Sequence, residues 1–237
     1  MKKIKSFLIA LFLVTSFNNI FSQIEKTVIF DSLKLYVYSA KFISNYGITT
    51  NEKIHLLPSG LPWEFQKTQT KYSVKYFPSD SLINLVIDPT SKKGEKISRR
   101  IISSTTGAFE NDEKIWIHPF RDNQYKYTEV APFPYIRFDS LMVGKSWDGD
   151  KTFILSGWGK FKGNVTSKYQ IVGNKKIDFN GIVLENCWEI VATSIHNKLG
   201  QSDAKFIFHA KYGFIEMNYK MYDGTLIDFK LEEVILK

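Results

Sequence analysis

The chain has 237 residues, a formal net charge of +8 and a single cysteine, Cys187. The lone cysteine excludes an intramolecular disulfide, and a chain of this length buries enough surface to be stable without one. Lysine and arginine are scattered along the sequence, whereas nucleic-acid binding requires a clustered basic face with interleaved aromatic residues. We therefore expect no nucleic-acid partner.

The N-terminus has the form of a secretory signal peptide. Lys2, Lys3 and Lys5 precede an apolar run over residues 7–14, and Ser22-Gln23 closes the segment in a manner that resembles Bacteroidota signal peptides. The apolar run is shorter than the roughly 20 residues that a transmembrane helix needs. We expect residues 1–22 to be removed, which lowers the net charge to 8 − 3 = +5. The mature protein is then exported to the periplasm or the exterior, with no transmembrane segment.

The N-terminal half alternates apolar and polar residues in short runs, which is typical of half-buried strands. Residues 33–38 and 71–77 are the clearest examples. Between them, Pro58-Ser59-Gly60-Leu61-Pro62 predicts a loop, because proline and glycine interrupt regular structure.

The stretch from Lys168 to Leu236 predicts an antiparallel meander, because strand-like runs are broken by turn residues about every 8–12 positions. Asp223-Gly224 suits a two-residue type I′ turn, and Gly173-Asn174 and Asn180-Gly181 are expected to break the chain in the same way. In residues 184–195 the drier face changes side, which a twist, a bulge or a curved sheet would explain.

These patterns predict an all-β, mainly antiparallel fold. The sheet would be a curved meander in the form of a half-barrel or a sandwich, with little helix. Because a β fold of about 200 residues is routinely one domain, we expect a single domain over residues 23–237, with a subdivision near residues 121–134 as the alternative.

The middle of the chain has the most distinctive composition. The segments IWIHPFR, PFPYIRF, VGKSW and KYGFIEMNYKMYDGT together resemble a family of secreted, β-rich Bacteroidota proteins with no assigned activity, over residues 110–236. The closing meander is also similar in pattern to the curved half-barrel sheets of LolA-like periplasmic lipoprotein carriers. That similarity implies a fold, and no motif transfers the carriers' function to particular residues.

His118 and Arg121 form the best candidate for chemistry, because a histidine and an arginine on a proline-fixed backbone could bind an anion or act as acid and base. The structural alternative is a locally hydrogen-bonded His118, with Arg121 paired to Asp122 or Glu129. Asp148-Gly149-Asp150 offers two oxygen ligands for Ca²⁺, but a solvated turn is favoured. We expect no metal and no cofactor.

Aromatic residues make up 15% of the chain, enough to fill a core and also to line a concave site. Our leading hypothesis is an exported, non-enzymatic protein that binds a lipid or other apolar or amphipathic ligand, or an envelope protein. One alternative is a hydrolase of envelope or carbohydrate material that uses His118 and Arg121, and another is a structural interaction module of an envelope complex. The expected ligand-binding residues are Trp116, His118, Arg121, Phe133, Tyr135, Trp147, Trp158 and Trp188.

Three Asp-Ser-Leu tripeptides recur, and they resemble the O-glycosylation acceptor pattern of exported Bacteroidota proteins. The candidate acceptors are Ser32, Ser81 and Ser140. The alternative is that Asp-Ser favours a turn before each strand.

Overall fold

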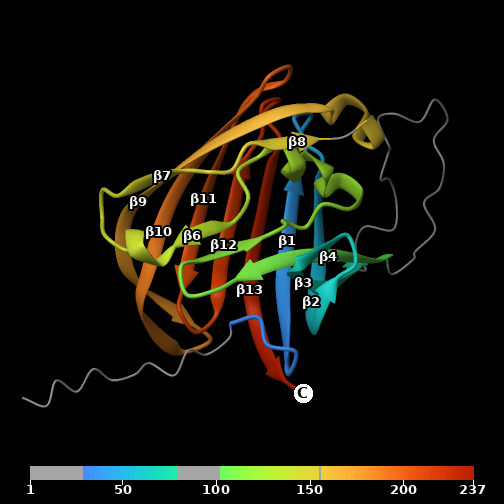
Figure 1. Ribbon diagram of the computed structural model, residues 1–237. Coiled ribbons are helices and arrows are strands. Elements are labelled where there is room, and N and C mark those ends of the chain that lie inside the picture. Colours follow the sequence, from blue (N-terminus) through green and yellow to red (C-terminus); the bar gives the residue numbers. More distant parts are fainter. Residues whose placement is uncertain (1–28, 79–101, 155) are drawn as a thin grey trace, which may run out of the picture.

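The computed structural model describes residues 29–78, 102–154 and 156–237, and this part of the chain forms one 13-stranded antiparallel sheet. The path of neighbouring strands is β6-β5-β4-β3-β2-β1-β13-β12-β11-β10-β9-β7, and β8 also pairs with β9 (Figure 1). The strands are β1 (Lys34–Ile43), β2 (Thr49–Trp63), β3 (Gln66–Pro78), β4 (Ile102–Glu110), β5 (Lys114–Ile117), β6 (Tyr135–Arg137), β7 (Ser146–Asp148), β8 (Thr152–Ile154), β9 (Gly163–Phe179), β10 (Ile182–His196), β11 (Gly200–His209), β12 (Gly213–Lys220) and β13 (Leu226–Leu236). Three 3-10 helices accompany them, η1 (Asn123–Val130), η2 (Phe138–Ser140) and η3 (Ser156–Phe161).

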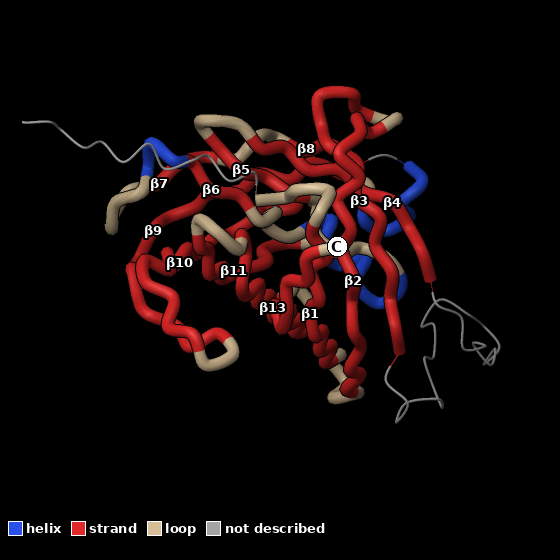
Figure 2. Tube along the Cα trace, turned by 90° about the horizontal axis from the view of Figure 1, so that it is seen from below, coloured by secondary structure: helices blue, strands red, loops and turns tan. Residues whose placement is uncertain are grey.

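The sheet curves so strongly that its two ends approach each other. Seen from below, the strands surround an interior, and β6 lies beside β7 (Figure 2). No backbone pairing joins these two strands among the described residues, so the sheet is not closed. Side chains connect them instead, because the Tyr135 ring lies 6.0 Å from Trp147 and 5.4 Å from Tyr169. This junction, which we call the seam, confirms the predicted curved all-β half-barrel.

Period-two alternation places apolar side chains on the inner face of the sheet. In β1 the buried residues include Tyr36, Tyr38 and Ala40, and in β13 they are Ile227, Phe229 and Leu231. The outer face of the meander carries ion pairs instead, such as Glu189 between Lys175 and Lys205. Antiparallel sheets commonly pack one face against the core and expose the other to solvent, and this sheet does the same.

Residues 118–134 leave the sheet between β5 and β6 and occupy the space inside its curve, and we call them the plug. Figure 1 shows this segment, which contains η1, in front of the long strands. The Phe120 ring packs edge-on against Tyr38 of β1 and Phe229 of β13, at centroid distances of 5.1 and 5.0 Å. Tyr125 stacks on Tyr76 of β3. The plug therefore completes the hydrophobic core that the sheet alone leaves open.

The turns of the meander agree in part with the sequence. Asn180 and Gly181 have φ of 55° and 79° and form the expected two-residue connection between β9 and β10. Gly173 does not end a strand, because β9 continues through it. The pairing register with β10 shifts at this point, between Glu189 and Ile190. The expected type I′ turn at Asp223-Gly224 is also wrong. Only Gly224 has positive φ, at 88°, and the connection from β12 to β13 is longer than two residues.

Two further local irregularities have a physical cause. The predicted change of the drier face towards Ile195 is wrong, because Ile190 and Ser194 are buried and Ile195 is exposed. A bulge lies earlier in β10, where the pairing register shifts between Leu184 and Cys187 and Asn186 has a φ of 57°. Residues 58–62 are not the predicted loop. They belong to β2, where the register shifts between Pro58 and Pro62 because proline cannot donate to the ladder.

The predicted signal peptide over residues 1–22 lies outside the described residues. Across the ranges that are described, no helix is long and apolar enough to cross a membrane.

Candidate functional site

A cavity of about 70 Å³ lies at the seam, and three of the predicted ligand-binding residues line it. These are Trp116 of β5, Phe133 of the plug and Tyr135 of β6. Tyr169 of β9 supplies a fourth ring from the opposite side. Trp116 and Tyr135 alternate along their strands with Ile115 and Ile136. Tyr135 and Tyr169 belong to the core cluster and Trp116 packs against it, so the cavity lies at the edge of the core.

The polar lining of the cavity includes two carboxylates of different character. Glu129 at the end of η1 is 5% exposed, and burial raises its pKa although the neighbouring Arg121 opposes that rise. Asp150 is exposed, so the cavity reaches the surface near this residue. The pKa values of Tyr135 and Tyr169 are raised mainly by burial, and the negative charge of Asp150 raises both further. The charge of Asp150 therefore acts on the rings that line the cavity.

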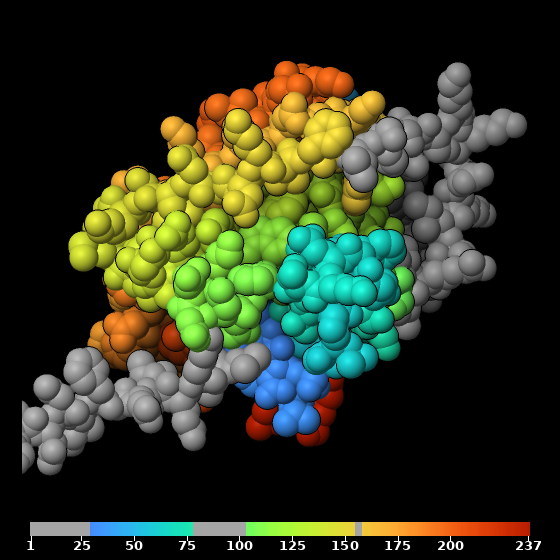
Figure 3. Space-filling model, viewed as in Figure 1, coloured from blue at the N-terminus to red at the C-terminus, as the bar shows by residue number. Residues whose placement is uncertain are grey.

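The local sequence explains why a space remains here. Pro132 and Pro134 flank Phe133 and have no N–H, so this edge cannot extend the ladder towards β9 through those positions. The Tyr169 hydroxyl instead donates to the carbonyl oxygen of Phe133 at 3.0 Å. On the other side Gly149 approaches β9 closely, since a Cβ there would lie 2.9 Å from the Tyr169 ring. Figure 3 shows the segment around residue 150, in yellow, bordering the green of residues 105–135.

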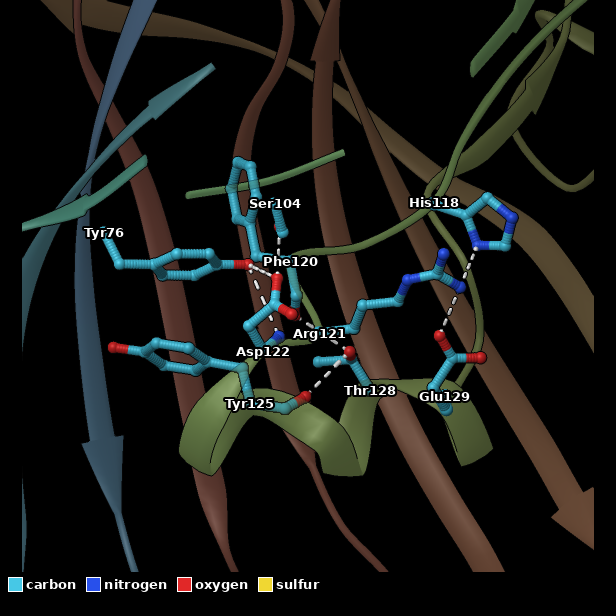
Figure 4. A network of polar contacts seen from close by, with 9 residues as sticks. All are labelled: Tyr76, Ser104, His118, Phe120, Arg121, Asp122, Tyr125, Thr128 and Glu129. Atoms are coloured by element: carbon cyan, nitrogen blue, oxygen red, sulfur yellow. Dashed lines mark hydrogen bonds and ion pairs between the residues drawn. The ribbon is translucent and has the colours of Figure 1, made fainter. Parts of the chain in front are cut away.

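Next to the cavity, Arg121 organises a second cluster (Figure 4). Its guanidinium donates to Glu129 Oε1 at 2.6 Å and lies 3.2 Å from His118 Nδ1. The guanidinium also lies over the rings of Trp63 and Trp158, at 5.8 and 5.6 Å from their centroids. Of the two carboxylates that the sequence offered to Arg121, Glu129 is therefore the partner. The other, Asp122, accepts hydrogen bonds from Tyr76 and Ser104.

His118 is held as a neutral ring. Burial and the positive charge of Arg121 lower its pKa to about 3. Its ring lies 4.6 Å from Trp116, 5.5 Å from Trp63 and 5.3 Å from Phe133 between centroids. With Arg121 donating to Nδ1, the neutral ring accepts a hydrogen bond there and keeps its single proton on Nε2. At neutral pH the imidazolium form that would act as a general acid is therefore not populated.

The structure divides the eight predicted residues into groups. Trp116, Phe133 and Tyr135 line the cavity, and Trp147 stacks behind it on Tyr169, at 5.5 Å and an interplanar angle of 5°. His118, Arg121 and Trp158 form the adjacent cluster. Trp188 belongs to neither group, because it lies in β10 opposite Phe208 of β11.

Sequence reasoning did not identify Trp63 and Tyr169. It named Glu129 as a possible partner of Arg121 and Asp150 as a possible Ca²⁺ ligand, but neither as a residue that lines a cavity. Tyr169 occupies one inward position in the regular alternation of β9, where nothing distinguishes it from a core residue. Trp63 closes the Pro58–Pro62 stretch, and an aromatic residue after two prolines was the available signal.

The metal and modification candidates can be placed only in part. Within the described ranges no group of three or more His, Cys, Asp or Glu side chains could hold a metal ion. Ser32 is exposed and follows Asp31, whose carboxylate accepts from the Leu33 N–H in a local turn. Ser140 is half-buried in η2, and Ser81 lies outside the described residues. Glycosylation stays a prediction.

A second, larger hollow of about 440 Å³ lies on the meander and is lined by both charged and apolar residues. Lys205, Lys220 and Asp228 border it together with the exposed apolar side chains of Val191 and Leu226. No residue predicted from the sequence belongs to this hollow.

Neither a protein-family model nor a curated protein sequence matches the chain. Solved structures do match in fold. A candidate lipoprotein from Parabacteroides distasonis is 8% identical, with a TM-score of 0.46, over 87% of this chain and 96% of that one. A candidate exported protein with a YmcC-like fold from Bacteroides fragilis is 7% identical, with a TM-score of 0.40, over 86% and 96%.

A LolA superfamily protein from Nitrosomonas europaea is 8% identical, with a TM-score of 0.33, over 86% of each chain. The chain is similar to these structures, which are described as a candidate lipoprotein, a candidate exported protein and a LolA superfamily protein. Because every TM-score is below 0.5, they carry no argument about a ligand or about particular residues.

Proposed function

We propose that this is an exported, non-enzymatic binding protein that holds one end of an apolar or amphipathic small molecule in the seam cavity. The observation that carries the proposal is the lining itself. Four aromatic rings and two carboxylates converge on one space, and these rings come from four separate places, β5, the plug, β6 and β9. Concave sites with aromatic walls and a few polar groups are the usual form of ligand pockets.

The size of the cavity limits what it accepts. Pockets that enclose a whole drug-sized ligand measure roughly 300–1,000 Å³, and the seam cavity has about 70 Å³. It therefore takes a terminal group, and the remainder of the ligand lies outside, next to the exposed Asp150.

The hydrolase alternative receives less support from the Arg121 cluster. A general base works best with a pKa near the working pH, and the pKa of His118 is lowered to about 3. Arg121 is engaged by Glu129 and covered by two tryptophan rings, which leaves it poorly placed for an anionic substrate.

Native mass spectrometry of the processed protein, purified from its own envelope without detergent, tests the proposal. We expect a non-covalent adduct that is lost on denaturation. Ala131→Leu adds an apolar side chain that fills the cavity, because Ala131 is 1% exposed and lines it. This variant should fold and lose the adduct. Val191→Leu, on the outer face, is the matched control and should retain it.

An adduct that survives Ala131→Leu in a folded protein would place the ligand elsewhere and contradict the proposal. Sequencing the mature N-terminus in the same preparation tests export. A chain that begins at Gln23 is expected, and a chain that begins at Met1 would contradict cleavage.

A further inference from the structure

The four rings of the seam cavity are arranged as walls around a small space. Tyr135 and Tyr169 meet edge to face, at 5.4 Å and 79°. Trp116 and Phe133 are tilted by 45° at 5.5 Å. The faces of aromatic rings carry negative potential, so rings set at angles around one point attract a cation placed there.

The charges at the cavity have the same sign as the ring faces. The described residues that line it include Glu129 and Asp150 but no lysine or arginine. Arg121 is bound to Glu129 Oε1 and compensates one of the two negative charges. Asp150 carries the second negative charge, at the mouth where a ligand enters. Lys114 lies outside the lining, with its Nζ 5.8 Å from the centroid of the Tyr135 ring.

The remaining lining is suited to alkyl groups more than to a naked metal ion. Ala131 and Val165 contribute methyl groups. Among the described residues no cluster of three or more metal-binding side chains is present. A cation that carries its own apolar surface meets both the rings and these methyl groups, which a strongly hydrated inorganic ion does not.

We infer that the seam cavity binds an alkylated ammonium group, with Trp116, Phe133, Tyr135 and Tyr169 enclosing the cation and Asp150 facing it from the entrance. This inference rests on the proposed function and gives the chemical class of the group that enters the cavity. The carrier of the ammonium group is either a free small molecule or a lipid headgroup.

The test titrates the processed protein with choline and with its neutral isostere 3,3-dimethyl-1-butanol, in which carbon replaces nitrogen. Calorimetry gives the affinities, and the N-methyl proton resonance of choline reports the environment. Enclosure by rings shifts that resonance upfield. We expect choline to bind at least about fivefold more tightly than the alcohol, which corresponds to roughly 1 kcal/mol of cation–π and charge attraction.

Asp150→Asn is the matched variant, because Asp150 is exposed and its loss leaves the packing intact. It should weaken choline binding about two- to fivefold, as expected for one partly exposed charge, and leave the alcohol unaffected. Asp148→Asn makes the same charge change two residues away, on a side chain outside the cavity lining, and should have no effect.

The outcomes separate the two proposals. Equal affinity for choline and the alcohol would overturn the ammonium inference and leave an apolar binding site. No binding of either probe, in a protein that also yields no adduct from its envelope, would overturn both. An equal loss in Asp148→Asn and Asp150→Asn would mean that surface charge, and not the cavity, attracts the cation, which also overturns the inference.

A short-chain phosphocholine below its micelle concentration distinguishes the sources of the ammonium group. Tighter binding than choline assigns the site to a lipid headgroup, and equal binding assigns it to a free cation. An upfield methyl shift is required in both cases, and its absence would overturn the inference.

Discussion

The two halves of the plug differ in what they contact. Phe120 and Tyr125 are almost fully buried against β1, β3 and β13, where aromatic rings surround them on several sides. Glu129 and Phe133, which follow Tyr125 by fewer than ten residues, line a cavity that reaches the surface. One short segment thus closes the core with its first half and builds the walls of a site with its second.

The polar contacts differ in the same way. In the first half, Asp122 is held by Tyr76 and Ser104, and the Thr128 hydroxyl lies 2.9 Å from the Phe120 carbonyl oxygen. In the second half, one carboxylate oxygen of Glu129 is bound by Arg121 and the residue also faces the cavity. The first half therefore fixes the position of the second, so stability and binding should respond to different substitutions.

Phe120→Ala should produce the largest effect. Phe120 is 2% exposed and packs on Tyr38 and Phe229, so truncation leaves a cavity and costs about 3–5 kcal/mol of unfolding free energy. Urea unfolding measures it. Phe153→Ala, at a side chain that is 59% exposed, is the control and should change stability by less than about 0.5 kcal/mol. Similar losses in both variants would contradict the assignment of Phe120 to the core.

Arg121→Met should come next, because it leaves the buried Glu129 carboxylate without its cation. Removing one partner of a buried ion pair lowers the free energy of unfolding by about 3–5 kcal/mol when the remaining group stays buried and charged. Here Glu129 can take up a proton, since burial without Arg121 raises its pKa further above the unfolded value. A raised carboxyl pKa gives stability that is present at low pH and lost as pH rises, so the loss should be larger at pH 8 than at pH 5.

The double variant Arg121→Met/Glu129→Gln should recover part of that stability at pH 8, because it removes the unpaired charge. If it is as unstable as the single variant, the cost lies in packing against Trp63 and Trp158 and not in the buried carboxylate.

His118→Asn should change the pH dependence of stability. The His118 pKa is about 3 in the folded protein and 6.5 ordinarily, so between these values the unfolded chain binds more protons. Stability from the neutral ring is therefore complete above pH 6.5 and lost as pH falls towards 3. As pH falls by two units from 6.5, the free energy of unfolding of the wild type should decrease by about 2 kcal/mol more than that of His118→Asn. Parallel curves would show that the ring is not held neutral.

The smallest effect is expected away from the plug, at the outer-face pair of Lys205 and Glu189, whose atoms lie 2.5 Å apart. Exposed ion pairs contribute only about 0.2–1 kcal/mol, so Lys205→Met should change the unfolding midpoint slightly, and 1 M salt should abolish the difference. A loss as large as that of Arg121→Met would contradict the contrast between the buried and the exposed pair.

Much of the fold follows from local sequence patterns. Alternation in residues 168–236 and the Asn180-Gly181 turn predicted the antiparallel meander, because side-chain period and positive φ are properties of short stretches. The bulge at Gly173 and the strand through Pro58 were not predicted, since a glycine or proline permits either a turn or a register shift and the partner strand determines which forms.

Local sequence patterns are enough to predict a β-rich, antiparallel chain and to place Trp116, Phe133 and Tyr135 in a proline-flanked region of unusual composition. The tertiary structure alone decided that the sheet curves until its ends meet and that Tyr169 faces Tyr135 across the seam. It also decided that Glu129 pairs with Arg121 beside the same cavity. The physical reason is that local periodicity gives the face on which a side chain lies, whereas the curvature summed over thirteen strands determines which faces come together.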